Sequence, residues 1–75
     1  MIIGIPTEVK VAEKRVAVTP SGVRTLVQNG HTVLLQSNAG LGSGFPNEQY
    51  IQAGAQIIVH QKDIWADAHM IMKVK

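Results

Sequence analysis

Residues 19–36, TPSGVRTLVQNGHTVLLQ, carry the signals of a helix followed by a strand. Thr19 and Pro20 mark a helix start, because a threonine hydroxyl caps free backbone N–H groups and proline is tolerated at the first helical position. Three apolar residues then follow the i, i+3, i+4 spacing of one helix face: Val23, Leu26 and Val27. Gly30 stands where a glycine ends a helix. This stretch therefore predicts a helix over 20–29 and a strand over 32–36.

The same alternation of strand and helix signals extends over the rest of the chain. The additional predicted strands are 1–5, 56–59 and 69–74, and the segment 15–18 is a candidate for extended structure. The additional helices run from a cap at Asn47 to near Gly54 and over 63–68. Strands that alternate with helices at short spacings predict an α/β fold with a parallel sheet and flanking helices. The strand over 69–74 is apolar on both faces, which predicts a central position. The strand order stays open.

Composition and length exclude several classes of protein. The chain has 75 residues, 45% of them hydrophobic and 16% charged, so it is at most one small domain. A formal charge of +2 without a basic cluster gives little support for nucleic-acid binding. The absence of cysteine excludes a disulfide framework and fits a reducing cytoplasm. No apolar run has the length of a membrane span. The apolar run 70–75 stops without a polar tail, which predicts that the chain is the first part of a longer protein.

Two cations occupy the positions where open parallel sheets bind ligands, the carboxyl ends of strands. Arg15 follows the first predicted strand and Lys75 ends the fourth, so both would reach one cleft if these strands are neighbours. A guanidinium matches a carboxylate bidentately, and an ammonium polarises a carbonyl oxygen, so the pair suits an α-keto acid. Lys73, Glu8 and Glu13 are candidates for supporting positions. The alternative interpretation is that these are solvated surface charges.

Other candidate sites are weaker. The glycine-rich loop 40–44 fails the G-x-G-x-x-G spacing because position 45 is Phe45, so it predicts a structural turn rather than a phosphate site. The three histidines lack metal-ligand spacing, and we expect them to be capping or surface residues: His31, His60 and His69. Trp65, with Ile64, is expected to pack a helix face on the sheet.

Six motifs follow one another in a fixed order along the whole chain. They are Gly4-Ile5-Pro6-Thr7-Glu8, Glu13-Lys14-Arg15-Val16-Ala17-Val18-Thr19-Pro20, Gly30-His31-Thr32-Val33, Ala39-Gly40-Leu41-Gly42-Ser43, Ala53-Gly54-Ala55 and Lys73-Val74-Lys75. With them the sequence resembles the N-terminal segment of the family shared by alanine dehydrogenases and pyridine nucleotide transhydrogenases. The resemblance implies a Rossmann-like substrate domain, of which residues 1–75 are the first part.

The resemblance also implies an activity and roles for two residues. In the dehydrogenase branch, L-alanine is interconverted with pyruvate and ammonia using NAD, by a cytoplasmic enzyme that is usually a homohexamer. Arg15 would bind the substrate carboxylate and Lys75 would contact the same substrate. The catalytic histidine and aspartate and the NAD-binding domain would lie beyond Lys75, so the isolated chain is expected to be inactive.

Two alternatives remain beside the dehydrogenase. Transhydrogenase α subunits, which are part of a membrane proton pump, tend to carry Lys-Val-Asn where this chain has Lys73-Val74-Lys75. That difference favours the dehydrogenase branch, because a neutral amide cannot stabilise developing charge as an ammonium does. The second alternative is a free-standing module that binds a small carboxylate.

Overall fold

The computed structural model describes residues 1–7 and 17–72. Its elements in chain order are β1 (Ile2–Ile5), α1 (Pro20–Gln28), β2 (Thr32–Gln36), the 3-10 turn η1 (Leu41–Ser43), α2 (Asn47–Ala53), β3 (Gln56–Ile58), α3 (Gln61–Asp67) and β4 (Met70–Ile71). The strands form one parallel sheet in the order β3-β2-β1-β4. The predicted α/β class is therefore confirmed. None of the helices in this described part is long and apolar enough to cross a bilayer.

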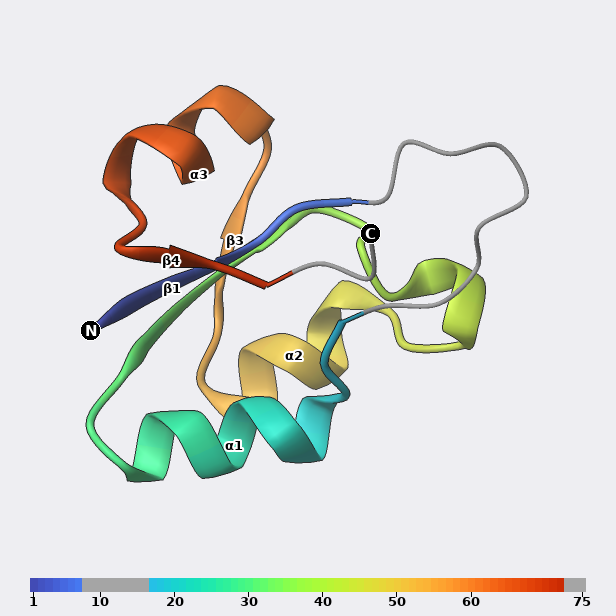
Figure 1. Cartoon of the computed structure of the whole chain (residues 1–75). Coiled ribbons are helices and arrows are strands. Elements are labelled where there is room, and N and C mark those ends of the chain that lie inside the picture. The colour runs from blue at the N-terminus through green and yellow to red at the C-terminus, as the bar shows by residue number, and fades with distance from the viewer. Residues whose placement is uncertain (8–16, 73–75) are drawn as a thin grey trace.

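The sheet separates two helical layers, with α1 and α2 on one face and α3 on the other (Figure 1). Alternate residues of β1 explain this arrangement, because successive side chains of a strand point to opposite faces. Ile3 and Ile5 are buried in the core that α1 and α2 cover. Gly4 faces α3, since a Cβ placed on it would meet side chains of Ile64 and Ala68. The absence of a side chain at Gly4 thus allows α3 to lie directly on β1.

Helix α1 has the predicted start and end. The Thr19 hydroxyl accepts a hydrogen bond from the Gly22 backbone N–H at 3.3 Å, and Pro20 is the first helical residue. Gly30 has a φ of 89°, and the N–H of His31 donates to the Leu26 carbonyl at 3.1 Å. This is the Schellman arrangement in which a left-handed glycine lets the chain turn back onto the helix. The chain then enters β2 directly beside β1.

Three sequence-based expectations are wrong in position. Strand β4 is at the edge of the described sheet, because β1 takes the central place between β2 and β4. Its apolar Met70 is therefore 42% exposed. Trp65 is 51% exposed although Ile64 is fully buried, because neighbouring residues on a helix point about 100° apart and only one can face the sheet. Asn47 is the first residue of α2, with Pro46 at the cap position, and its side chain does not cap the helix.

Candidate functional site

The carboxyl edge of the sheet has its topological switch point between β1 and β4. From β1 the chain passes to β2 and β3 on one side and then returns to β4 on the other. The register pairs Ile3 with Met70 and Gly4 with Ile71, and the Met72 N–H donates to the Gly4 carbonyl at 2.9 Å. Ligands of open α/β sheets bind in the crevice at such a point. A cleft shared by the ends of the first and fourth strands requires that these strands are neighbours. The structure meets this condition.

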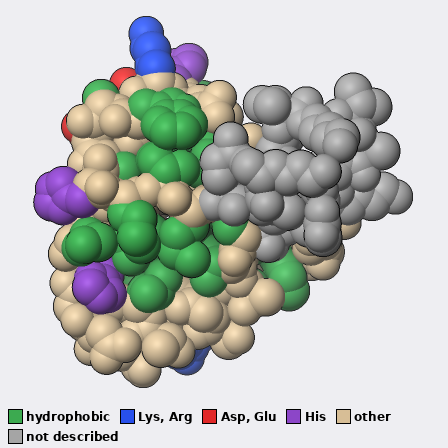
Figure 2. All heavy atoms as spheres, in the orientation of Figure 1, with side chains coloured by type: hydrophobic (Ala, Val, Ile, Leu, Met, Phe, Trp, Pro, Cys, Tyr) green, Lys and Arg blue, Asp and Glu red, His purple; other side chains and the backbone are tan. Residues whose placement is uncertain are grey.

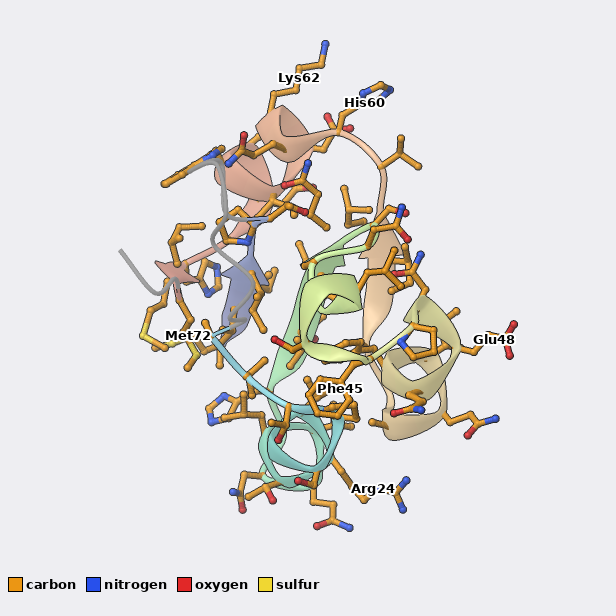
Figure 3. All side chains as sticks on the ribbon, turned by 90° about the vertical axis from the view of Figure 1, so that its right-hand side faces the viewer. Arg24, Phe45, Glu48, His60, Lys62 and Met72 are labelled. Atoms are coloured by element: carbon orange, nitrogen blue, oxygen red, sulfur yellow. The ribbon has the colours of Figure 1, made fainter. Side chains whose placement is uncertain are left out.

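The predicted ligands themselves lie outside the described residues, namely Arg15, Lys75, Glu8, Glu13 and Lys73. What the structure describes is the chain next to them. Thr7 follows β1, and Met72 follows β4, so the described chain reaches both groups of candidates from the same edge. Figure 3 looks onto this edge, with Met72 beside β1 and with Arg24, Glu48 and Lys62 pointing outward at the periphery.

Polar contacts tie the end of β1 to the end of β2. The Thr7 backbone N–H donates a hydrogen bond to Gln36 Oε1 at 2.8 Å. The Thr7 hydroxyl donates a second one to the Ser37 carbonyl at 3.4 Å. The Ser37 N–H in turn donates to the Ile58 carbonyl at 2.8 Å, at the end of β3. The first residues after these strands are thereby held in fixed relation to one another.

Asn47 extends this polar contact set to α2. Its Oδ1 accepts a hydrogen bond from the Asn38 N–H at 2.8 Å, and its Nδ2 donates to the Ser37 hydroxyl at 3.0 Å. Asn38 has a φ of 66°, a conformation that asparagine tolerates better than most residues. The side chain of Asn47 therefore fixes the turn after β2 instead of capping its own helix.

Tyr50 connects α2 to the chain that precedes α1. Its ring is fully buried and meets Phe45 edge to face, with ring centroids 6.2 Å apart. Its hydroxyl donates to the Val18 carbonyl at 2.9 Å. Burial raises the pKa of the Tyr50 phenol above its usual value, so the group stays a neutral donor at physiological pH. Tyr50 thus holds the described chain three residues after Arg15.

The glycine-rich loop has the structural role that its spacing predicted. Gly44 has a φ of 88°, and a Cβ on Gly40 would collide with the Tyr50 ring and hydroxyl. The loop therefore packs against Tyr50 so closely that only glycine fits at position 40.

The histidines have no shared site in the described residues, where no group of three metal-ligating side chains occurs. His69 is an exposed residue, and its Nδ1 accepts a hydrogen bond of 3.2 Å from the N–H of Ile2 at the start of β1. His60 precedes α3 without a capping bond from its side chain. The Nδ1 of His31 is buried without a partner.

Sequence reasoning did not identify Gln36 or Tyr50. Tyr50 and Ala53 have the i, i+3 spacing of a buried helix face, and both are buried in α2. That spacing is a signal for burial of Tyr50. Nothing in the local sequence indicates that its hydroxyl reaches Val18, because this contact joins residues 32 positions apart.

Comparison with known proteins agrees with the described geometry. Residues 4–75 match the family model described as "Alanine dehydrogenase/PNT, N-terminal domain". Curated relatives include an alanine dehydrogenase of Bacillus subtilis (strain 168), 60% identical over the whole chain, and one of Bilophila wadsworthia (strain 3_1_6), 53% identical over the whole chain. The chain spans 20% of the length of each.

Solved structures give the same result. A structure titled L-alanine dehydrogenase matches with a TM-score of 0.93 and 49% identity, over 97% of this chain and 20% of that one. A transhydrogenase from Sinorhizobium meliloti matches with a TM-score of 0.88 and 33% identity, over the same shares. The chain belongs to the alanine dehydrogenase/PNT N-terminal domain family.

Proposed function

We propose that this chain is the first part of the substrate domain of an NAD-dependent enzyme that interconverts L-alanine with pyruvate and ammonia. The observation that carries the proposal is the pairing of β1 with β4 at the switch point, which brings together the described ends of the two segments that contain Arg15 and Lys75. The names of the relatives at 53% and 60% identity support the reaction. The hexameric assembly and cytoplasmic location implied by the resemblance stay predictions.

Each of the two cations has a separate task in this proposal. The Arg15 guanidinium binds the substrate carboxylate through two parallel hydrogen bonds, which fixes the orientation of the substrate. The Lys75 ammonium polarises the carbonyl oxygen of pyruvate and stabilises the negative charge that develops on it. If NAD is bound by the rest of the enzyme, it would supply the redox chemistry by taking up the hydride that L-alanine loses in the oxidative direction. Binding and orientation of the substrate are the contribution of this chain.

A transhydrogenase subunit is the second candidate, supported by the structural match at 33% identity. The third residue of the motif Lys73-Val74-Lys75 favours the dehydrogenase, because a lysine at that position supplies the charge that a carbonyl substrate requires.

The test is pyruvate titration of the full-length protein with Arg15→Ala and Lys75→Ala. Because each change removes hydrogen bonds to a charged group, we expect about a ten- to hundredfold loss of affinity. The matched controls are Arg24→Ala and Lys62→Ala, whose side chains point outward in Figure 3 and should leave affinity unchanged. Unchanged pyruvate affinity in both Arg15→Ala and Lys75→Ala would refute the proposed roles.

A further inference from the structure

The outer edge of β4 is open in the described part of the sheet. β4 is the last strand in the order β3-β2-β1-β4, so it has a described neighbour on one edge only. The Met72 N–H donates to the Gly4 carbonyl of β1. Because alternate residues of a strand direct their backbone groups to opposite neighbours, the N–H and carbonyl of Ile71 point toward the open edge. The backbone of β4 can therefore pair with one more strand.

Both faces of β4 carry apolar side chains. Ile71 points toward α3, since its side chain lies next to the Cβ position of Gly4 on that face. Met70 points to the opposite face, because successive side chains alternate, and it is 42% exposed. Figure 2 shows hydrophobic side chains gathered on the surface near β4. A parallel strand that is apolar on both faces is typical of the interior of a sheet, whereas edge strands usually carry charge or proline.

The helical layers do not extend over β4. Among the described elements, α3 packs on β1, β2 and β3, and α1 and α2 pack on β2 and β3. β4 has its substantial contacts with β1. The described fold therefore leaves β4 without a second strand neighbour and without a helix of its own, although its sequence suits both.

The path of the chain indicates where a further crossover would lie. The steps from β1 to β2 and from β2 to β3 run in one direction, with α1 and α2 on one face of the sheet (Figure 1). The step from β3 to β4 runs in the opposite direction, with α3 on the other face. Crossovers between parallel strands are right-handed in almost all cases. A further step past β4 in the same direction therefore has its crossover on the α3 face, toward which Ile71 points.

The size of the relatives favours a later segment of the same chain as the occupant of this edge. The chain spans 20% of the length of the two alanine dehydrogenases. A segment of the same polypeptide has a high effective concentration at the edge of β4. A second copy of the chain is disfavoured, because β4 is two residues long and pairing two such edges buries far less than the roughly 1,200 Å² of a specific interface.

We propose that in the full-length protein a segment after residue 75 adds a parallel strand to the open edge of β4, with its crossover on the α3 face, so that β4 becomes an interior strand. This inference rests on the proposed function only in that the chain is the first part of a longer protein. The connection after β1 leads to α1 on one face, and the connection after β4 would lead to the other face. Such divergence opens the crevice at a switch point, so the later segment would form one wall of it.

The first test is photo-crosslinking of the full-length protein, with p-benzoylphenylalanine placed at position 70. We expect a crosslink to a peptide from after residue 75 within one polypeptide, identified by mass spectrometry after digestion. The matched control is the same amino acid at position 51, because Ile51 is exposed to a similar degree, 54%, but lies on α2. It should not crosslink to that peptide. A product of twice the mass, joined to residues 1–75 of a second copy, overturns the proposal, and so does the absence of any crosslink from position 70.

The second test places a charge at the same position. Met70→Lys is nearly neutral on an open edge, but inside the sheet it buries an unpaired ammonium, so we expect the Tm of the full-length protein to fall by about 5–10 °C. Met70→Leu keeps the side chain apolar, and Ile51→Lys places the charge on α2, so each should change the Tm by less than about 2 °C. An unchanged Tm in Met70→Lys overturns the proposal. If Met70→Lys does not fold, the crosslink decides.

The outcome is separable from that of the proposed function, because crosslinking requires no activity. Reduction of NAD with L-alanine is measured on the same full-length protein. A protein that crosslinks as expected but does not react with L-alanine refutes the proposed function and leaves this inference intact. An active protein without the expected crosslink refutes this inference alone.

Discussion

The two faces of the sheet differ in how completely their hydrophobic side chains are buried. The face under α1 and α2 contains a continuous core that includes Ile3, Leu35 and Tyr50, all at 1% exposure or less. The face under α3 has Ile64 buried against Gly4, while Trp65 on the same helix is half exposed. Figure 2 shows hydrophobic side chains gathered on the surface near β4 and α3. The face covered by α1 and α2 is also the one against which the partly buried Val18 and Met72 pack.

Truncation of one aromatic residue on each face of the sheet should produce the largest difference in the free energy of unfolding. Tyr50→Ala removes a fully buried ring, so we expect the free energy of unfolding of this domain to fall by about 3–5 kcal/mol. Trp65→Ala removes a ring that is 51% exposed, and the loss should be about 1 kcal/mol. Hydrogen exchange of peptides from residues 1–75 in the full-length protein measures both. Equal losses would show that the two faces do not differ.

Addition of one methyl group to each face should give a smaller effect with a clear location. Gly40→Ala forces a Cβ against Tyr50, and Gly4→Ala forces one against Ile64 and Ala68. Overpacking of this kind costs about 1–3 kcal/mol. We expect faster exchange at the start of α1 in Gly40→Ala, because Tyr50 supports Val18, and at α3 in Gly4→Ala.

The control for the glycine pair is Leu41→Ala, since Leu41 adjoins Gly40 but is 55% exposed. Its effect should stay within about 0.5 kcal/mol. Faster exchange of α3 in Gly40→Ala, or of α1 in Gly4→Ala, would contradict the assignment of each glycine to one face.

Alkaline pH should produce the smallest effect, confined to the face covered by α1 and α2. Burial raises the pKa of Tyr50 in the folded state above the unfolded value near 10. The contribution of the neutral phenol is therefore complete below about pH 10 and is lost as the pH rises through the folded-state pKa. Thermal unfolding between pH 9 and 11 should show a decline in wild type that is smaller in Tyr50→Phe. An identical decline in both would exclude Tyr50 as its source.

Much of the fold could be predicted because its signals are local. The cap at Thr19, the left-handed Gly30 and the apolar spacing of α1 are all read from neighbouring residues, and the structure confirms them. The place of β4 could not be predicted, because apolarity on both faces indicates burial but not which strand is the neighbour. Strand order depends on pairing between distant residues, such as Ile3 with Met70.

The sequence selects candidate ligands by their chemistry, but it does not indicate the hydrogen bonds that the structure shows at the ends of the neighbouring strands. Charge and position after a strand were enough to select Arg15 and Lys75, whose roles stay predictions because both lie outside the described residues. The side chains of Gln36 and Tyr50 form hydrogen bonds with backbone groups of Thr7 and Val18. Every residue has a backbone carbonyl and almost every residue has a backbone N–H, so the type of the partner residue does not indicate such a contact.

The central place of β1 has a consequence for the order of folding. β1 pairs with β2 as soon as residues 32–36 are available, but its other edge stays open until residues 70 and 71 arrive. Contacts between such distant residues form late, because a long loop must close first. On the ribosome, β1 therefore emerges before β2 and β4, but it is paired along both edges only after residues 70 and 71 have been synthesised.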